Sequence, residues 1–212
     1  MVWGDRSPGD ARWSLYLLKP RFQAWLRPLV GRFARAGITA NQVTLAAVVG
    51  SLALGVFVIW RLPDTWAFVL IPFWMFVRMA LDAIDGMLAR EFGQQSRLGA
   101  YLNELTDVIA DTVLYVPFAL LAPFAPAWVV AVMVLAVISE YAGVLGAMVG
   151  ASRRYDGPLG KSDRAFAFGA LGLWVGLGSP LPAWAAFIMP LLASLLALTI
   201  INRVRGGLNE ST

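Results

Sequence analysis

Residues 81–115 read LDAIDGMLAREFGQQSRLGAYLNELTDVIADTVLY, and they place acids and an amide at helical spacing between two apolar segments. The chain as a whole is apolar, because 59% of its 212 residues are hydrophobic and 14% are charged. An ordinary soluble domain has roughly 25% charged residues, and a domain of this size exposes much of its surface to water. With a mean hydropathy of +0.69, the sequence predicts a protein that lies in a lipid bilayer.

Six apolar segments are each close to the roughly 20 residues that a membrane-spanning helix needs. Pro180 and Pro182 separate the last two segments, and LAPFAPAW at 121–128 is typical of a turn between the third and the fourth. We therefore predict an all-α polytopic membrane protein, a single domain over residues 1–212 with a six-helix membrane core at 40–202. The segments lie at about 42–60, 65–81, 99–121, 127–150, 165–179 and 183–201.

We expect no signal peptide in the N-terminal region, since it has early acids, several prolines and no uninterrupted apolar stretch. From Trp13 to Phe33, aromatic and Leu residues alternate with Lys and Arg. This pattern predicts an amphipathic helix at 11–36 that lies at the membrane interface, with its basic side toward anionic headgroups. The alternative is a basic tail that serves only as a topology signal.

Basic residues also predict the orientation of the chain. Fifteen of the 17 Lys and Arg residues fall on the same side of the six segments as the two termini, whereas Arg61 lies on the other side and Arg78 lies within the second segment. By the positive-inside rule, both termini face the cytoplasm, which indicates a multi-pass protein of the inner (plasma) membrane. The pI near 9.8 then reflects membrane topology, and no nucleic-acid partner is predicted.

The chain contains no Cys and no His. This composition excludes disulfides, Cys or His zinc sites, Ser-His-Asp triads and catalytic thiols. Any chemistry must use carboxylates, Lys, Arg, hydroxyl groups or metals bound by oxygen. Oxygen ligands favour Mg²⁺, Mn²⁺ or Ca²⁺.

Successive residues of a helix are separated by about 100°, so polar and small residues form one stripe at the cytoplasmic end of the second segment and another at that of the third. A short loop between the two helices can let the stripes face each other. An unpaired acid at a helix centre costs roughly 2.5–3.5 kcal/mol, and several acids together become protonated unless a cation lies among them. The stripes therefore predict a metal site. The alternatives are that the acids cap helix ends, or that they line an ion path together with Glu140, as in a transporter. One stripe comprises Asp82, Asp85, Gly86 and Ala89, and the other comprises Gly99, Asn103, Asp107 and Asp111.

The segment DAIDGMLAREFGQQSRLGAYLNELTD at 82–107 resembles the signature D-x2-D-G-x2-A-R-x8-G-x3-D-x3-D of the CDP-alcohol phosphatidyltransferase family. LLKPRFQAWLRP at 17–28 and LNELTDVIADTVLYVPF at 102–118 resemble a bacterial inner-membrane subgroup of this family. Two other segments resemble the family: TANQVTL at 39–45, with Ala40 in place of Pro, and the basic GPLGKSDRAF at 157–166. The third Asp of the signature is Asn103. The matching positions are Asp82, Asp85, Gly86, Ala89, Arg90, Gly99 and Asp107.

The resemblance implies a homodimeric enzyme that moves a phosphatidyl group from a CDP-lipid, CDP-diacylglycerol, to the hydroxyl of a polar alcohol and releases CMP. It also implies one or two Mg²⁺ or Mn²⁺ ions and makes Asp107 the general base. Small side chains let a bulky ligand approach a helix closely. The implied metal ligands are Asp82, Asp85, Asn103 and Asp107, and the implied CDP-binding residues are Asn41, Thr44, Asp82, Gly86, Ala89, Arg90 and Gly99.

Asn103 removes one charge from the implied metal site, and Asp111 is the candidate compensating ligand, with Glu104 as a second choice. The substitution also leaves open a catalytically impaired relative that still binds lipid or nucleotide. On the cytoplasmic side, a basic cluster suits an anionic acceptor such as glycerol 3-phosphate or inositol phosphate. The positive-inside rule explains the same charges without a ligand. The cluster comprises Arg153, Arg154, Lys161, Arg164 and Arg203.

Overall fold

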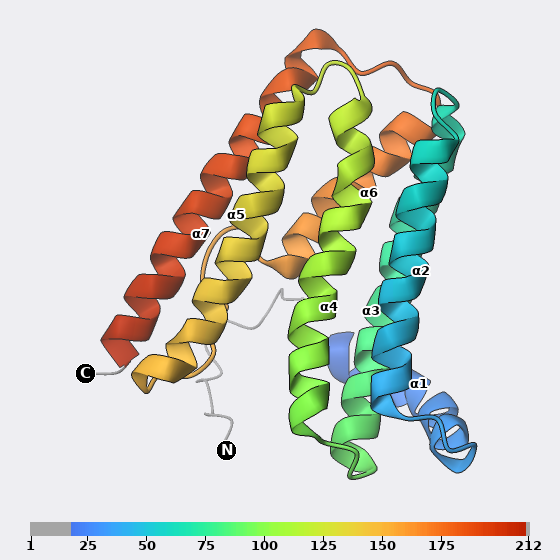
Figure 1. The fold of residues 1–212 in the computed structure, drawn as a ribbon, viewed down its shortest axis with the longest axis vertical. Helices are drawn as coiled ribbons and strands as arrows, with labels where there is room; N and C mark the ends of the chain where they lie inside the picture. The colour runs from blue at the N-terminus through green and yellow to red at the C-terminus, as the bar shows by residue number, and fades with distance from the viewer. Residues whose placement is uncertain (1–17, 211–212) are drawn as a thin grey trace.

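The computed structural model describes residues 18–210, and within that range it contains helices and no strand. Helices α2 to α7 run side by side, and α1 lies at one end of this bundle (Figure 1). The α-helices are α1 (Leu18–Arg35), α2 (Ala40–Trp60), α3 (Leu70–Glu91), α4 (Arg97–Tyr115), α5 (Pro126–Leu145), α6 (Lys161–Gly176) and α7 (Ile188–Glu210). Short 3-10 helices cover Thr65–Val69, Val116–Leu120, Gly146–Val149 and Ala183–Phe187.

Four segments of the described chain are long and apolar enough to cross a membrane. They confirm the predicted all-helical membrane character, whereas the number of six spans stays a prediction. Helix α4 carries three acids within 19 residues and α6 has 16 residues, so α4 is more charged and α6 is shorter than the four apolar segments. Both helices nevertheless lie among the others in the bundle (Figure 1). The four segments are Ala40–Trp60, Thr65–Glu91, Pro126–Val149 and Ala183–Glu210.

Several helices extend beyond the apolar segments that predicted them. Helix α3 continues to Glu91, ten residues past the predicted end at 81, and α7 continues to Glu210. Helix α6 begins at Lys161 instead of 165. Apolar side chains mark only the part of a helix that lies in lipid, because the backbone hydrogen bonds of a helix are internal and can continue into a polar region. The predicted helix at 11–36 begins outside the described residues, which contain it from Leu18 to Arg35.

The connections divide the bundle into two ends. The start of α2, the loop at 92–96, the loop at 150–160 and the C-terminal end of α7 lie together at what we call the site end, and the remaining connections lie at the opposite end (Figure 1). Thr39 opens α2 with a capping box, in which its hydroxyl accepts from the Gln42 backbone N–H at 3.3 Å. The Ser96 hydroxyl opens α4 by accepting from the Gly99 N–H at 2.9 Å. These caps fix the helix starts beside the signature residues.

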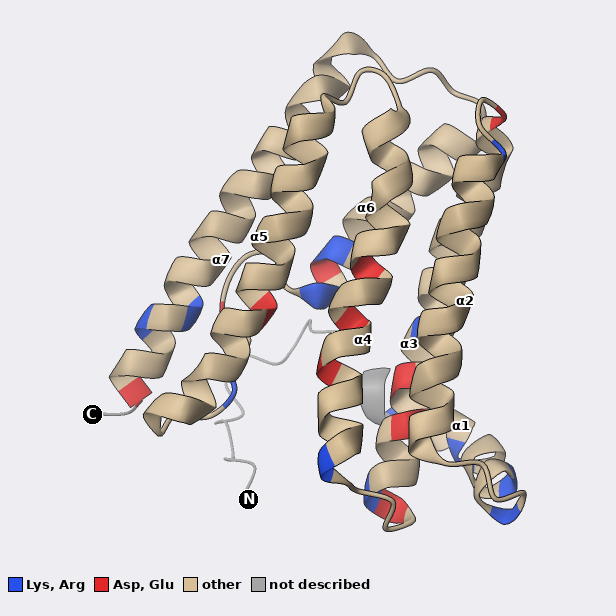
Figure 2. Ribbon diagram, in the orientation of Figure 1, with Lys and Arg blue, Asp and Glu red and all other residues tan. Residues whose placement is uncertain are grey.

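Apolar and charged side chains occupy different halves of the interior. Toward the opposite end, the Tyr115 and Phe168 rings stack with centroids 3.7 Å apart, and Phe118 meets Phe68 and Phe168 edge to face. Among the described residues, Arg61 and Asp64 are the charged pair at the opposite end, and the other charges lie in the middle of the bundle or at the site end (Figure 2). The apolar half therefore holds the helices together and leaves the other half for polar chemistry.

Helix α1 is amphipathic, as the sequence predicts. Leu26 and Val30 are buried against residues of α3 that include Met87 and Leu88, while Arg32 and Arg35 are exposed. Its location at a membrane interface stays a prediction. The packing places α1 at the site end of the bundle (Figure 1).

Close contact between α2 and α4 depends on Gly55, and we expect Gly55→Ala to lower the free energy of unfolding by about 1–3 kcal/mol. A Cβ at this position would lie 2.9 Å from the Val113 carbonyl oxygen, a backbone atom that cannot rotate away. The matched control is Gly31→Ala on α1, where no heavy atom lies within 4 Å of the added carbon. Thermal unfolding of the two variants in detergent tests this expectation, and equal midpoints would contradict it.

Candidate active site

The two predicted stripes lie on neighbouring helices at the site end, as the sequence predicts. The acids of α3 and α4 lie in the lower half and the middle of the bundle in Figure 2, with those of α4 higher than those of α3 and the N-terminal half of α2 beside them. Asp82 and Asp107 are half-buried, and Asp85 is buried with 7% of its surface exposed. The stripes therefore face the interior of the bundle and not the surrounding lipid.

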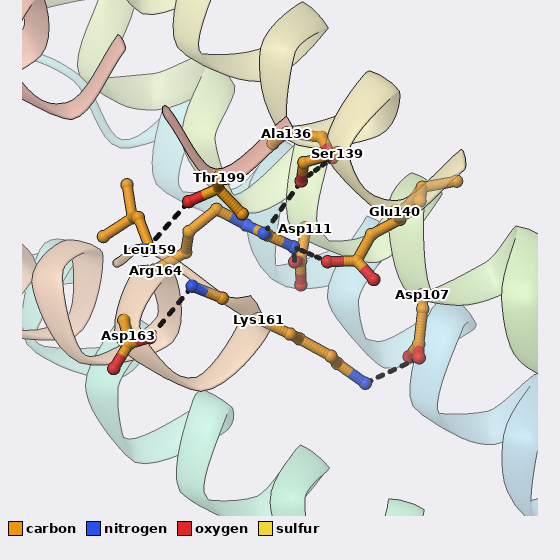
Figure 3. Close-up of polar contacts among 12 residues, drawn as sticks. Asp107, Asp111, Ala136, Ser139, Glu140, Leu159, Lys161, Asp163, Arg164 and Thr199 are labelled. Carbon is orange, nitrogen blue, oxygen red and sulfur yellow. Dashed lines mark hydrogen bonds and ion pairs between the residues drawn. The ribbon is translucent and has the colours of Figure 1, made fainter. Parts of the chain in front are cut away.

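One cation lies between the two stripes. The Lys161 Nζ is 2.7 Å from the Asp82 Oδ2 and 2.6 Å from the Asp107 Oδ2. Lys161 comes from the first turn of α6, Asp82 from α3 and Asp107 from α4, so three helices contribute to this contact. Figure 3 shows the part between Lys161 and Asp107. Because one ammonium nitrogen reaches both carboxylates, Asp82 and Asp107 are close enough to share a single cation.

Residues of α2 support the α3 and α4 stripes. The Thr44 hydroxyl donates to the Asp85 Oδ2 at 2.6 Å, and both side chains are buried. A Cβ added to Gly99 would lie 2.9 Å from the Asn41 Oδ1, so the α4 backbone approaches Asn41 closely. The structure thus brings together Asn41, Thr44, Asp85 and Gly99, which come from three different helices.

The remaining signature residues follow α3 and α4. Gly86 and Ala89 are half-buried on α3, and Arg90 folds back so that a Cβ on Gly86 would lie 2.9 Å from its Nη2. Asn103 is half-buried one turn before Asp107. Sequence reasoning missed Gln94, whose side-chain oxygen accepts from the Ala40 N–H at 2.7 Å and so fixes the α3–α4 loop to the start of α2.

A network of buried arginines lies deeper than the shared-cation contact. Arg78 donates to Asp111 at 2.7 Å and lies 3.4 Å from Asp107. Arg164 reaches the other oxygen of Asp111 at 3.3 Å and Glu140 at 3.0 Å (Figure 3). The sequence predicts Arg78 within the second span and indicates no role for it. In the structure Arg78 is 5% exposed and is the counter-ion of two buried or half-buried acids. Asp111 is therefore held by two guanidinium groups.

Glu140 on α5 is the acid on which several arginines converge. It accepts from Arg164 and lies 3.4 Å from the Arg203 Nη1 and 3.5 Å from the Arg153 Nη2. Arg153 also pairs with Glu104 on α4, and Arg203 donates to the Ser139 carbonyl oxygen. Glu140, which the sequence offered as part of an ion path, is instead 8% exposed and saturated with arginine contacts.

A small open cavity lies next to the shared-cation contact. Three of the five predicted acceptor residues line it, namely Arg153, Lys161 and Arg164. Arg203 reaches the cavity only through its contact with Glu140. Acids also line the cavity: Glu104, Asp107, Asp111 and Glu140.

Arg154 is the predicted acceptor residue that the cavity does not include. It pairs with Asp156 at 2.7 Å and with Glu210 on α7, and Glu210 also accepts from Ser152. The hydrogen bond to Asp156 raises the pKa of Arg154 above its ordinary value. These contacts fasten the 150–160 loop to the end of α7, so the structure gives Arg154 a structural role.

The donor set fits a divalent metal in its chemistry. Over residues 18–210, no three acids lie close enough together to hold a metal ion. Asp82 and Asp107 nevertheless hold one ammonium at 2.7 and 2.6 Å, compared with the roughly 2.3–2.6 Å of Ca²⁺ and the roughly 2.0–2.1 Å of Mg²⁺ to oxygen. Asp85 lies one turn beyond Asp82 on α3, and Thr44 orients its carboxylate. Hard oxygen ligands of this kind suit Mg²⁺ or Mn²⁺.

Known proteins resemble this chain over most of its length. Inner membrane protein YnbA of Escherichia coli is 42% identical over 195 residues, which cover 92% of this chain and 96% of that protein. The phosphatidylinositol phosphate synthase of Mycolicibacterium smegmatis is 32% identical over 190 residues, covering 84% of this chain and 81% of the synthase.

A solved structure shares the fold. The Mycobacterium tuberculosis phosphatidylinositol phosphate synthase with CDP-DAG bound has a TM-score of 0.69 at 21% identity and covers 87% of this chain and 92% of that chain. The same enzyme in complex with manganese and citrate has a TM-score of 0.68 at 22% identity, covering 85% of this chain and 88% of that chain. Residues 37–201, which include both stripes and the cavity, match the family model described as CDP-alcohol phosphatidyltransferase. The chain belongs to the CDP-alcohol phosphatidyltransferase family.

Proposed function

We propose that this protein transfers a phosphatidyl group from CDP-diacylglycerol to the hydroxyl of a polar alcohol and releases CMP. The observation that carries the proposal is that Asp82 on α3 and Asp107 on α4 share one cation, the ammonium of Lys161. The M. smegmatis relative is named for the synthesis of a phosphatidylinositol phosphate, and the M. tuberculosis structure contains CDP-DAG. Both names support a donor and a product of this class.

In the proposed reaction, the alcohol oxygen attacks the phosphatidyl phosphorus, and the bond from this phosphorus to the CMP oxygen breaks. Asp107 accepts the hydroxyl proton, and CMP leaves with the bonding electron pair. One or two Mg²⁺ or Mn²⁺ ions, when bound, would supply positive charge to the pyrophosphate and to the leaving group. Asp82, Asp85 and Asp107 would hold this metal with the amide oxygen of Asn103. Asp111 is less suited to join them, since Arg78 and Arg164 already occupy its two oxygens.

The nucleotide is proposed to bind where α2, α3 and α4 converge. Asn41 and Thr44 carry polar groups there, and the small residues Gly86, Ala89 and Gly99 allow a ligand to approach the helix backbones closely. Arg90 lies over Gly86 and suits a phosphate oxygen. The diacyl chains would extend into the bilayer. The acceptor is proposed to enter the neighbouring cavity, and the sequence-based prediction of an anionic or phosphorylated alcohol is retained for it.

The membrane arrangement is part of the proposal. The site end faces the cytoplasm of the inner membrane, α1 lies at the interface, and α2 to α7 form six spans of one domain over residues 1–212. The relative called an inner membrane protein supports this location. A homodimer is proposed from the family resemblance.

The function is tested with the purified protein, CDP-diacylglycerol, Mg²⁺ or Mn²⁺ and a panel of alcohols that includes glycerol 3-phosphate and inositol phosphate. We expect metal-dependent release of CMP, with a new phospholipid identified by mass spectrometry. Bound CDP-diacylglycerol without CMP release for any alcohol would favour a catalytically impaired relative. Ion transport in proteoliposomes without CMP release would favour a transporter, the alternative raised by the intramembrane acids.

Asn103 gives a direct prediction within the site. We expect Asn103→Asp to keep or raise the rate of CMP release, because it adds a carboxylate one turn before Asp107 and strengthens a proposed metal ligand. The measurement is CMP release against metal concentration, with Asn202→Asp, an exposed amide on α7, as the control. A large loss of activity in Asn103→Asp alone would show that this site requires the neutral amide.

A further inference from the structure

We propose that Lys161 couples metal binding to the binding of an anionic group on the acceptor: its ammonium holds Asp82 and Asp107 together without metal, and metal binding releases it into the cavity as an anion ligand. This inference rests on the proposed function for the identity of the metal ligands. The sequence predicts five basic residues as ligands of an anionic acceptor, and this inference assigns that role to Lys161.

The contacts of Lys161 distinguish it from the other cations of the site. Its ammonium contacts Asp82 and Asp107, which are both proposed metal ligands, and the side chain crosses from α6 toward α4 (Figure 3). Lys161 also lines the open cavity. The same side chain therefore borders both the metal site and the acceptor cavity.

The arginines have other partners. Arg164 pairs with Asp111 and Glu140, and Arg153 pairs with Glu104 and Glu140. Arg203, at 2% exposure, pairs with Glu140. Since none of these three acids is among the four proposed metal ligands, metal binding leaves the arginines neutralised. An anionic acceptor would have to compete with a carboxylate for each of them.

Among the three cations that line the cavity, metal binding changes the surroundings of Lys161 alone in this way. Arg78 also lies 3.4 Å from Asp107, but it keeps its 2.7 Å contact with Asp111 and does not line the cavity. A divalent cation between Asp82 and Asp107 repels an ammonium at the same position, and it takes the oxygens that the ammonium contacted. A lysine side chain is a point charge on a flexible four-carbon stem, so the ammonium can turn into the cavity while α6 stays in place. There it becomes a cation without its former carboxylate partners and favours a phosphate or carboxylate.

The coupling must act in both directions, because the effect of one ligand on the affinity of another is reciprocal. Metal should strengthen anion binding, and an anion in the cavity should strengthen metal binding. Coupling between two ligands is typically 5–150-fold. The expected order is therefore metal first and acceptor second, with Lys161 connecting the two steps.

The test measures Mn²⁺ affinity of the full-length protein in detergent from the electron paramagnetic resonance signal of free Mn²⁺. Titrations are made with inorganic phosphate and with chloride at the same ionic strength. For the wild type, we expect phosphate to tighten Mn²⁺ binding by a factor of roughly 5–150. The effect should persist with saturating CMP, which separates an anion in the acceptor cavity from one in the donor site.

Lys161→Met removes the ammonium and keeps a side chain of similar length. This variant should bind Mn²⁺ more tightly than the wild type in chloride, because no ammonium has to be displaced, and phosphate should no longer change its affinity. The matched control is Arg153→Met, which removes another cation from the same cavity. Since Arg153 contacts Glu104 and Glu140 but neither Asp82 nor Asp107, this control should keep the phosphate effect.

Several results would overturn the inference. They are a wild type whose Mn²⁺ affinity ignores phosphate, a Lys161→Met protein that retains the phosphate effect, and an effect that CMP abolishes. The wild-type titration stands even if Lys161→Met fails to fold. Mn²⁺ binding without coupling would overturn the inference alone, whereas coupling without CMP release for any alcohol would overturn the proposed function alone. Absence of Mn²⁺ binding to the wild type would overturn both.

Discussion

Asp107→Asn is expected to reduce CMP release by a factor of roughly 10²–10⁴, the usual contribution of a positioned general base, and to leave expression intact. The amide cannot accept the hydroxyl proton, and it also loses the negative charge that lies 2.6 Å from Lys161. The backbone should not change, because Asn and Asp have the same shape and Arg78 keeps its 2.7 Å contact with Asp111. Single-turnover CMP release with saturating CDP-diacylglycerol measures the loss at the chemical step.

The matched control for this variant is Asp64→Asn. Asp64 is an exposed acid that pairs with Arg61 at 2.5 Å at the opposite end of the bundle. Its replacement should leave CMP release unchanged. Unaltered turnover in Asp107→Asn would rule out Asp107 as the base, while a loss that high metal concentration fully restores would assign Asp107 to metal binding alone.

The spacing of polar residues in the sequence was sufficient to predict that two stripes form and that they lie close together. A spacing of three or four residues places Asp82 and Asp85 on one face of α3 and Asn103 and Asp107 on one face of α4, and a short loop must bring these helix ends together. The structure confirms the consequence for Asp82 and Asp107, which contact the same ammonium. Local periodicity carries this information because the two helices are neighbours in sequence.

The roles of the basic residues could not be predicted in the same way. Lys161 and Arg164 are one turn apart on α6, yet Lys161 reaches the α3 and α4 acids while Arg164 is buried at 2% exposure against Asp111 and Glu140. Their different partners depend on how α6 packs between α3, α4 and α5. The spacing of residues along α6 gives no information about this packing. Positive charge near a membrane also has a topological explanation, so the sequence alone could not separate anion ligands from structural arginines.

The largest expected effect on stability comes from Glu140→Gln. Glu140 is 8% exposed and is the common partner of Arg153, Arg164 and Arg203. Removing its charge leaves buried guanidinium groups without their counter-ion, and breaking a buried pair in this way costs about 3–5 kcal/mol. For a chain of this length, the thermal midpoint should fall by roughly 6–20 °C. Thermal unfolding in detergent, followed by circular dichroism, measures the shift.

Glu91→Gln is the matched control, because it makes the same chemical change in an exposed pair. Glu91 contacts Arg27 at 3.0 Å, and the two side chains are 37% and 61% exposed. A pair of this kind contributes about 0–1 kcal/mol, so its midpoint should move by a few degrees at most. Equal midpoints for the two variants would contradict a structural role for the arginine network. If Glu140→Gln kept its midpoint but gained affinity for phosphate, the arginines around Glu140 would be acceptor ligands that this acid masks, and Lys161 would not be the main anion ligand.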